Sequence, residues 1–249
     1  MNNYHILHGH PLVELDSVDS TNNYAANLLR DGNPADGTVI LSHFQTGGRG
    51  QRGAIWQSQP GENLTFSVIK YVPFLKPSEL FWLTQITALA IHSVVDIHVP
   101  KQTMVKWPND ILVDGIKIAG ILIENGLAGS KLTHCIIGIG LNINQFNFDG
   151  LDATSLFRES GSKFDIRNVL SDILAHFDRY FHLLRNGRYQ QIREEYLNHL
   201  YLRDISAQFQ SRGNQFEGII KDVSPEGNLV VNTSVGLREF ALKEIEFLG

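Results

Sequence analysis

The dipeptide Asp114-Gly115 places the firmest constraint on the fold of this chain. It separates two apolar runs, residues 111–113 and 116–124, with no other residue between them. Asp-Gly between apolar runs is typical of a two-residue hairpin turn, because both turn positions need a positive φ that these residues tolerate. We therefore expect two adjacent antiparallel strands in the middle of the chain.

Further strand and helix patterns surround this hairpin. Runs rich in β-branched and aromatic residues predict strands at residues 12–15, 38–44, 63–71, 105–106 and 133–143. Apolar residues at helical spacing, turn signals and capping residues predict helices at residues 22–30, 77–96, 166–184 and 189–199. Asp19 or Ser20 is expected to cap the first helix. The second is apolar on nearly all sides, so we expect it to be buried.

After about residue 203 the pattern changes to short strands separated by Gly-, Asn- and Pro-containing turns. This spacing is typical of a small β-barrel or SH3-like module. The sequence thus predicts an α+β protein. A mixed-sheet domain is expected at residues 1–202 and an SH3-like β-barrel at residues 203–249.

Composition limits the cellular setting. The 249 residues carry a net charge of −5 and 43% hydrophobic residues, with no basic surplus of the kind that nucleic-acid-binding modules show. The lone cysteine, Cys135, excludes an intramolecular disulfide and favours a reducing cytoplasm. Residues 1–11 lack the pattern of a secretory signal, and no run approaches 18 apolar residues, so we expect no membrane association.

A glycine-rich segment covers residues 45–53, which read Gln-Thr-Gly-Gly-Arg-Gly-Gln-Arg-Gly. Glycines let the backbone approach an anion closely, and Arg49 and Arg52 supply fixed positive charge. A mobile loop of this kind suits the capture of phosphate or carboxylate. A surface loop with solvated arginines is an equally open interpretation of this segment alone.

Two further segments carry polar residues next to apolar strands. Residues 106–110, Lys-Trp-Pro-Asn-Asp, surround a proline turn, and Lys117 follows in a run of otherwise apolar composition. A lysine in such a strand is unusual unless it is paired or faces a site, although it can also lie on the solvated face of a hairpin. Residues 138–142, Gly-Ile-Gly-Leu-Asn, end a buried-looking strand, where a ring can lie against the backbone. A tightly packed strand crossing would give the same pattern.

Together these segments resemble the biotin–protein ligase family. The match also includes residues 16–22, Asp-Ser-Val-Asp-Ser-Thr-Asn, and residues 117–122, Lys-Ile-Ala-Gly-Ile-Leu, and all segments fall in the family's order. The resemblance implies ATP-dependent activation of biotin to biotinyl-5'-AMP and transfer of the biotin to a lysine of a carrier domain. Gln51 departs from a common version of the loop, in which a second arginine stands at this position.

The resemblance also implies roles for individual residues. The residues expected to hold biotin are Ser20, Thr21, Asn22, Gln45, Gly48, Arg49, Gly50, Gln51, Lys117 and Gly120. Those expected to hold ATP or the adenylate are Arg52, Lys106, Trp107, Asn109, Asp110, Gly138, Gly140 and Asn142. Lys117 and Arg49 are the catalytic candidates, because a lysine between carboxylate and α-phosphate offsets their repulsion. Asp110 is expected to position Mg²⁺.

Several alternatives stay open beside this prediction. Lipoate–protein ligases and octanoyltransferases belong to the same superfamily, but they need an apolar tunnel where a biotin ring needs polar partners. Biotin-responsive repressors of the family carry an N-terminal helix-turn-helix domain, and only about 11 residues precede the predicted catalytic domain here, so we expect no DNA binding. A non-enzymatic ligand-binding module would have little use for Lys106 and Lys117 in one site.

The expected partner is a biotin carboxyl carrier domain. The sequence leaves open a homodimer, the acceptor's identity and the adenylate's lifetime.

Overall fold

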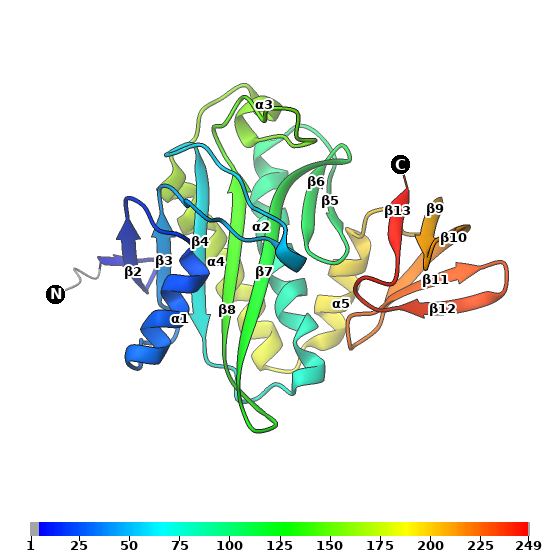
Figure 1. The fold of residues 1–249 in the computed structure, drawn as a ribbon, viewed down its shortest axis with the longest axis horizontal. Coiled ribbons are helices and arrows are strands. Elements are labelled where there is room, and N and C mark those ends of the chain that lie inside the picture. The colour runs from blue at the N-terminus through cyan, green and yellow to red at the C-terminus, as the bar shows by residue number, and fades with distance from the viewer. Residues whose placement is uncertain (1–4, 249) are drawn as a thin grey trace.

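A computed structural model describes residues 5–248 of the chain, apart from the side chain of Arg52. At its centre is an eight-stranded sheet with the order β1-β2-β3-β4-β8-β7-β6-β5 (Figure 1). Its strands are β1 (His5–Leu7), β2 (His10–Leu15), β3 (Val39–Ser42), β4 (Asn63–Lys70), β5 (Thr103–Lys106), β6 (Asp110–Val113), β7 (Ile116–Ala128) and β8 (Lys131–Asn142). Strands β2 and β3 are parallel and the other neighbouring pairs are antiparallel, which confirms the prediction of a mixed sheet.

The predicted hairpin joins β6 to β7. Asp114 has φ 48° and Gly115 has φ 84°, so both turn residues adopt the left-handed conformation that the sequence required. This turn fixes the register in which Leu112 pairs with Lys117, and a β-bulge between Ile111 and Leu112 then shifts the pairing by one residue, so that Asp110 pairs with Gly120. Two candidate site residues, Asp110 and Lys117, are thereby brought to neighbouring strands.

Helices cover both faces of the sheet. They are α1 (Thr21–Asp31), α2 (Phe81–His98), α3 (Leu156–Ser160), α4 (Ile166–Arg185) and α5 (Tyr189–Asn198), with short 3-10 turns at η1 (Gln51–Gly53) and η2 (Pro77–Glu79). Helix α1 lies on one face, whereas α2 and α4 pack together behind the other (Figure 1). The segment Pro77–His98 is long and apolar enough to cross a membrane, but 72% of its most apolar window is buried inside the protein, as in a core helix.

The start of α1 differs from the sequence prediction. Ser20 occupies the N-cap position, but its side chain makes no capping hydrogen bond. The Asp19 carboxylate instead accepts a hydrogen bond from the Asn23 side chain. The amide oxygen of Gln45 caps the helix, at 2.8 Å from the Thr21 backbone nitrogen. Ser20 is thus the N-cap residue, as one of the two predicted alternatives, but the expected capping by its own side chain does not occur, because a residue remote in sequence satisfies the exposed N–H group.

The C-terminal strands form a second, antiparallel sheet with the order β12-β11-β10-β9-β13. They are β9 (Ser206–Ser211), β10 (Asn214–Val223), β11 (Leu229–Thr233), β12 (Gly236–Phe240) and β13 (Glu246–Leu248). Among the described residues, the edge strands β12 and β13 are not hydrogen-bonded to each other, so the pairing is that of an open sheet. The division of the chain at residues 202 and 203 stays a prediction.

The second sheet packs directly against the first part of the chain. The indole Nε1 of Trp107 donates a hydrogen bond to the Gly227 carbonyl oxygen at 2.9 Å. Phe209 and Ile220 of the second sheet belong to the same buried cluster as Leu89 of α2. The two sheets therefore share one hydrophobic core.

Candidate active site

A cavity of about 320 Å³ opens between α1, the glycine-rich loop, β7 and β8, and the C-terminal sheet. Most of the predicted site residues line it. They are Ser20, Thr21, Asn22, Gln45, Arg49, Gly50, Gln51, Lys106, Trp107, Asn109, Asp110, Lys117, Gly120, Gly138 and Gly140. Segments that are far apart in sequence thus meet at one site.

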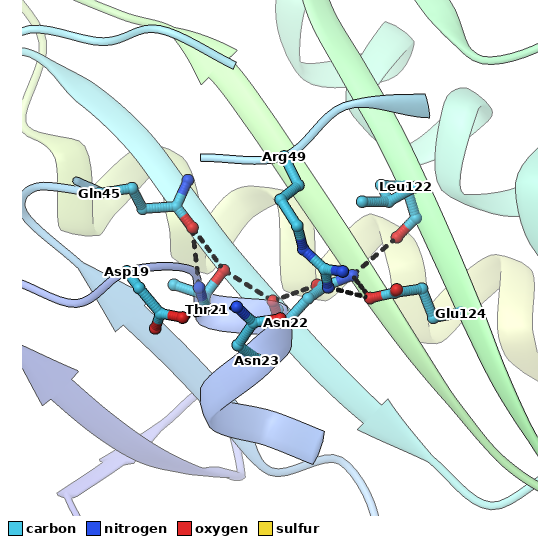
Figure 2. A network of polar contacts seen from close by, with 9 residues as sticks. Asp19, Thr21, Asn22, Asn23, Gln45, Arg49, Leu122 and Glu124 are labelled. Atoms are coloured by element: carbon cyan, nitrogen blue, oxygen red, sulfur yellow. Dashed lines mark hydrogen bonds and ion pairs between the residues drawn. The ribbon is translucent and has the colours of Figure 1, made fainter. Parts of the chain in front are cut away.

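At the α1 end of the cavity the polar side chains are neutral, and those of α1 and its N-cap are buried, whereas Gln45 is half-buried. Because Gln45 Oε1 accepts from the Thr21 backbone N–H, the Nε2 group of the same amide remains as a donor. Figure 2 shows this nitrogen on the side of Gln45 that faces away from Thr21. Ser20 is also buried and lines the cavity. This end therefore offers an amide donor and a hydroxyl to a ligand.

Hydrogen bonds to neighbouring buried side chains decide whether the Thr21 hydroxyl can accept a hydrogen bond from a ligand. Asn22 Nδ2 lies 2.8 Å from the Glu124 carboxylate, an acceptor, so Asn22 Oδ1 faces Ser67 and can only accept from its hydroxyl at 2.6 Å. Ser67 has one proton, and its oxygen lies 2.7 Å from Thr21 Oγ1. With the Ser67 proton given to Asn22, the Thr21 hydroxyl has two acceptors within reach, Ser67 Oγ and, at 3.2 Å, Gln45 Oε1, and it donates its single proton to one of them. The lone pairs of Thr21 then remain to accept an N–H from a ligand.

This network changes the expected role of Asn22. Its Nδ2 group reaches Glu124 and, at 3.4 Å, the Leu122 carbonyl, while its Oδ1 atom is held by Ser67. Asn22 lines the cavity, but its hydrogen-bonding groups are directed into the protein. It orients its neighbours rather than presenting a free amide.

The opposite end of the cavity is charged. Lys117 Nζ lies 2.7 Å from Asp110 Oδ1, across the β6–β7 hairpin. The Lys117 side chain is 37% exposed and that of Asp110 is 24% exposed, so both reach the cavity. The ammonium also lies 6.0 Å from the centre of the Trp56 ring. A cation held beside a carboxylate in an open cavity can exchange that partner for a ligand anion.

Two of the predicted glycines, Gly138 and Gly140, lie against side chains of the protein itself. A Cβ atom at Gly138 would collide with the Asn22 side chain, and one at Gly140 would collide with the Trp56 ring. Because Gly138 and Gly140 have no side chains, β8 leaves room for the side chains of Asn22 and Trp56. The sequence predicted that these glycines hold the adenylate, and it did not predict their contacts with Asn22 and Trp56.

Lys106 and Trp107 lie where the main domain meets the C-terminal sheet. Lys106 Nζ is 5.1 Å from the centre of the Phe247 ring, within the range of a cation–π contact. Phe247 and Ile245 line the cavity. Asn109 lines it too, and its Nδ2 donates to the Ile121 carbonyl oxygen at 2.8 Å. The C-terminal sheet therefore supplies part of the wall next to the charged end.

Two predicted residues that the structure describes in full, Asn142 and Gly48, do not line this cavity. Asn142 is buried and its Nδ2 donates to the Thr154 carbonyl at 2.9 Å, so its amide serves the fold and is not directed at a ligand. Gly48 borders an adjoining cavity with Arg49 and Glu124. The prediction for Arg52 rests on a side chain outside the described part of the structure.

Sequence reasoning missed four wall residues or their partners: Trp56, Glu124, Ile245 and Phe247. Trp56 follows the glycine-rich segment by three residues, and this proximity is the sequence signal that could have identified it. Nothing in the local sequence of Ile245 or Phe247 distinguishes them from core residues.

A divalent cation would find one carboxylate in the wall of the cavity, that of Asp110. In residues 5–248 no group of three or more metal-ligating side chains occurs. Magnesium prefers oxygen ligands and commonly binds through one or two carboxylates together with phosphate oxygens and water. The residues present therefore fit a magnesium ion that enters with a nucleotide, held by Asp110 with Asn109.

Comparison with known proteins places the chain in a family. The model of the biotin/lipoate A/B protein ligase family matches residues 14–142. The bifunctional ligase/repressor BirA of Bacillus spizizenii is 32% identical over 247 residues, covering 96% of this chain and 74% of its own length. The biotin–[acetyl-CoA-carboxylase] ligase of Mycobacterium tuberculosis is 29% identical over 226 residues, covering 88% of this chain and 83% of its own.

A solved structure agrees with these sequence matches. The biotin protein ligase of Aquifex aeolicus, in complex with biotin and ATP, superposes with a TM-score of 0.78 at 26% identity. The match covers 95% of this chain and 98% of that one. The chain belongs to the biotin/lipoate A/B protein ligase family.

Proposed function

We propose that this protein is a biotin–protein ligase, which activates biotin with ATP and transfers it to a lysine of an acetyl-CoA carboxylase carrier domain. The observation that carries the proposal is one cavity with neutral ring-binding groups at one end and Lys117 at the other. The Mycobacterium tuberculosis relative is named as such a ligase, and the Aquifex aeolicus structure holds biotin and ATP.

The α1 end matches the ureido ring of biotin. That ring has one carbonyl acceptor and two N–H donors. Gln45 Nε2 supplies a donor for the carbonyl, whereas Thr21 Oγ1 supplies an acceptor for an N–H. Ser20 supplies a second hydroxyl. Lipoate has no ureido group, so these polar groups favour biotin over the lipoate and octanoate substrates of the same superfamily.

The charged end matches the first chemical step. A biotin carboxylate oxygen attacks the α-phosphorus of ATP, a new O–P bond forms, and pyrophosphate leaves. Two anions must approach each other, and Lys117 lies where its charge can offset their repulsion and stabilise the transition state. Asp110 holds this ammonium in place until the ligand's oxygens compete for it. Magnesium, held by Asp110 and Asn109 together with the phosphates, would supply further positive charge.

The second step uses the same cavity. The acceptor lysine, as a neutral amine, attacks the carbonyl carbon of biotinyl-5'-AMP, an amide bond forms, AMP leaves, and the nitrogen loses a proton. Closure of the glycine-rich loop excludes water, which would otherwise hydrolyse the mixed anhydride. Cys135 has no part in either step, because burial raises the pKa of its thiol to about 12. We propose the cytoplasm as the location, where ATP and carboxylase acceptors are available.

The direct test is to incubate the protein with biotin, magnesium-ATP and a biotin carboxyl carrier domain and to weigh the carrier by mass spectrometry. The carrier should gain one biotinyl group per molecule. A carrier whose acceptor lysine is replaced by arginine is the control and should gain none. An unmodified wild-type carrier would refute the proposal.

A further inference from the structure

Glu124 lies in β7, outside every segment that the sequence analysis singled out as a ligand site. One of its carboxylate oxygens, Oε2, receives two donors from different parts of the chain (Figure 2). Asn22 Nδ2 approaches it from α1 at 2.8 Å, and Arg49 Nη2 approaches it from the glycine-rich loop at 2.6 Å. A single oxygen thus joins the ring-binding helix, the central sheet and the loop.

The loop has few other attachments to the sheet. Its first residues are bonded to the segment before α1, from Thr46 N to Val18 O and from Gly47 N to Asp19 O, whereas its later backbone bonds are local, such as those from Gly50 N to Ala54 O and from Trp56 N to Gly48 O. Among the side chains of residues 46–55 that the structure describes, Arg49 is the one that hydrogen-bonds to the central sheet. The Arg49–Glu124 pair therefore holds the loop in the position where Gly50 and Gln51 wall the cavity.

The other donor connects the same carboxylate to the ring end. Asn22 orients Ser67 and, through it, the hydroxyl of Thr21. Gly138 leaves space for the Asn22 side chain against β8. Glu124 consequently fixes the acceptor role of Thr21 and the position of Arg49 at once.

We propose that Glu124 is a positioning residue that anchors the closed glycine-rich loop over the ring end and thereby sets how long biotinyl-adenylate stays bound. The proposal rests on the biotin ligase function and adds a residue to it. Glu124 acts through Arg49 and Asn22. It does not take part in the bond-making steps.

Solvent exposure distinguishes this role from a purely structural one. The side chains of Arg49 and Glu124 are 40% and 38% exposed, and pairs this exposed contribute little to global stability. A loop that opens locally is far more sensitive to one such contact than the whole fold is. Loss of the pair should therefore change ligand release without changing the melting temperature.

The variant Glu124→Gln tests the contact of Glu124 with Arg49 separately from its contact with Asn22. Glutamine keeps the shape and an oxygen that can accept from Asn22, but it lacks the charge that pairs with Arg49. Release of labelled biotinyl-adenylate from the preformed complex should become about three- to tenfold faster. Trypsin should also cleave after Arg49 faster in the adenylate complex. Single-turnover adenylate formation should stay within about twofold of the wild-type rate.

Glu14→Gln is the matched control. Glu14 also pairs with an arginine, Arg167, and with His43, but it lies outside the cavity. It should leave adenylate release unchanged. Equal release rates in Glu124→Gln and wild type would overturn the proposal, as would a lower melting temperature together with slower adenylate formation.

A double-mutant cycle tests the mechanism. In an Arg49→Met background loaded with synthetic biotinyl-adenylate, Glu124→Gln should have no further effect on adenylate release, because its partner is already absent. Additive effects of the two substitutions would contradict the anchor. If Glu124→Gln does not fold, Glu124→Asp keeps the charge one methylene further away and should release the adenylate at an intermediate rate. A wild-type rate in that variant would equally contradict the anchor.

Failure of the proposed function would look different. Wild-type protein that forms no adenylate from biotin and ATP would refute the ligase function itself. If the wild-type protein forms the adenylate and the Glu124→Gln variant releases it at the same rate as the wild type, only the anchor is refuted.

Discussion

At the α1 end of the cavity the groups that match a ring are neutral, with Ser20 and Thr21 buried and Gln45 half-buried, whereas at the β6–β7 end the ligand-facing groups are charged and partly exposed. Thr21 is 4% exposed and its hydroxyl belongs to a closed chain of hydrogen bonds, but Lys117 is 37% exposed and held by one carboxylate. A ring with fixed donors and acceptors is recognised best by groups that cannot reorient. A reaction that brings anions together needs charges that are free to change partners. The two ends therefore differ because one selects a substrate and the other performs chemistry.

The strongest test of this comparison is Lys117→Ala. Loss of the transition-state cation should slow biotin-dependent ATP–pyrophosphate exchange by about a hundred- to a thousandfold, while biotin affinity changes little. Lys131→Ala removes an exposed lysine at the far end of the β7–β8 hairpin and is the control, with wild-type rates expected. A Lys117→Ala enzyme within a few-fold of wild type would show that the charged end does not perform the chemistry.

Thr21→Val addresses the ring end. The variant removes the acceptor that Thr21 offers to a ligand N–H and leaves Ser67 with Asn22 as its remaining side-chain partner, so the KM for biotin should rise about ten- to a hundredfold. The turnover rate at saturating biotin should stay within a few-fold of wild type. Thr38→Val, which deletes another buried hydroxyl that bonds to the Ala35 carbonyl, should change neither constant. A loss confined to kcat would reverse the roles of the two ends.

The loop that spans the two ends should respond to ligand. Residues 45–53 contain four glycines and no apolar anchor, so we expect the loop to be mobile in the free protein and ordered with biotin and magnesium-ATP. Trypsin cleavage after Arg49 and Arg52 should slow by about tenfold or more in the complex. Cleavage after Arg212, in an exposed C-terminal hairpin, supplies the reference rate within the same molecule. Cleavage after Arg49 and Arg52 at the same rate with and without ligand would argue against a ligand-ordered lid.

Phe247→Ala should have a smaller effect, and one limited to the charged end. Phe247 lines the cavity and contacts Lys106, so its loss should raise the KM for ATP about three- to tenfold and leave that for biotin unchanged. Phe146→Ala, an exposed aromatic outside the cavity, is the control. This substitution is a better test than truncation at residue 202, because the C-terminal sheet shares the core of the protein. A higher KM for biotin would indicate that the C-terminal sheet serves both ends.

The smallest effect should come from His92, which belongs to neither end. Burial, together with the neighbouring His199, lowers the pKa of His92 below its ordinary value of 6.5. As pH falls below that value, the unfolded chain binds more protons at this position than the folded one, so stability is lost. The melting temperature should therefore drop less between pH 7.5 and 5.5 in His92→Gln than in wild type. An identical drop would exclude His92 as a source of the acid sensitivity.

The sequence predicted the fold best where local chemistry decides the conformation. Asp114-Gly115 predicted the hairpin, and the period of apolar residues predicted α4, because neither depends on distant partners. Capping of α1 by Gln45 could not be predicted, since the acceptor is 24 residues away from the Thr21 backbone N–H. The same limit applies to closure of the C-terminal strands, which is decided by long-range pairing.

The candidate site shows the same division. Motif residues such as Lys117 and Gln45 were found because their type and order resemble a family. Asn142 was expected to receive the adenine, and its buried amide has a backbone acceptor, Thr154, that local sequence cannot reveal. Glu124 and Phe247 were missed for the reason that each becomes part of the site only through folding.

The central claim is that the neutral end of the cavity selects biotin for adenylation at the charged end. ATP–pyrophosphate exchange by the wild-type protein, measured side by side with biotin and with lipoate, tests it most directly. We predict rapid exchange with biotin and, with lipoate, none above the rate without an acid. Exchange that is as fast or faster with lipoate would contradict the account.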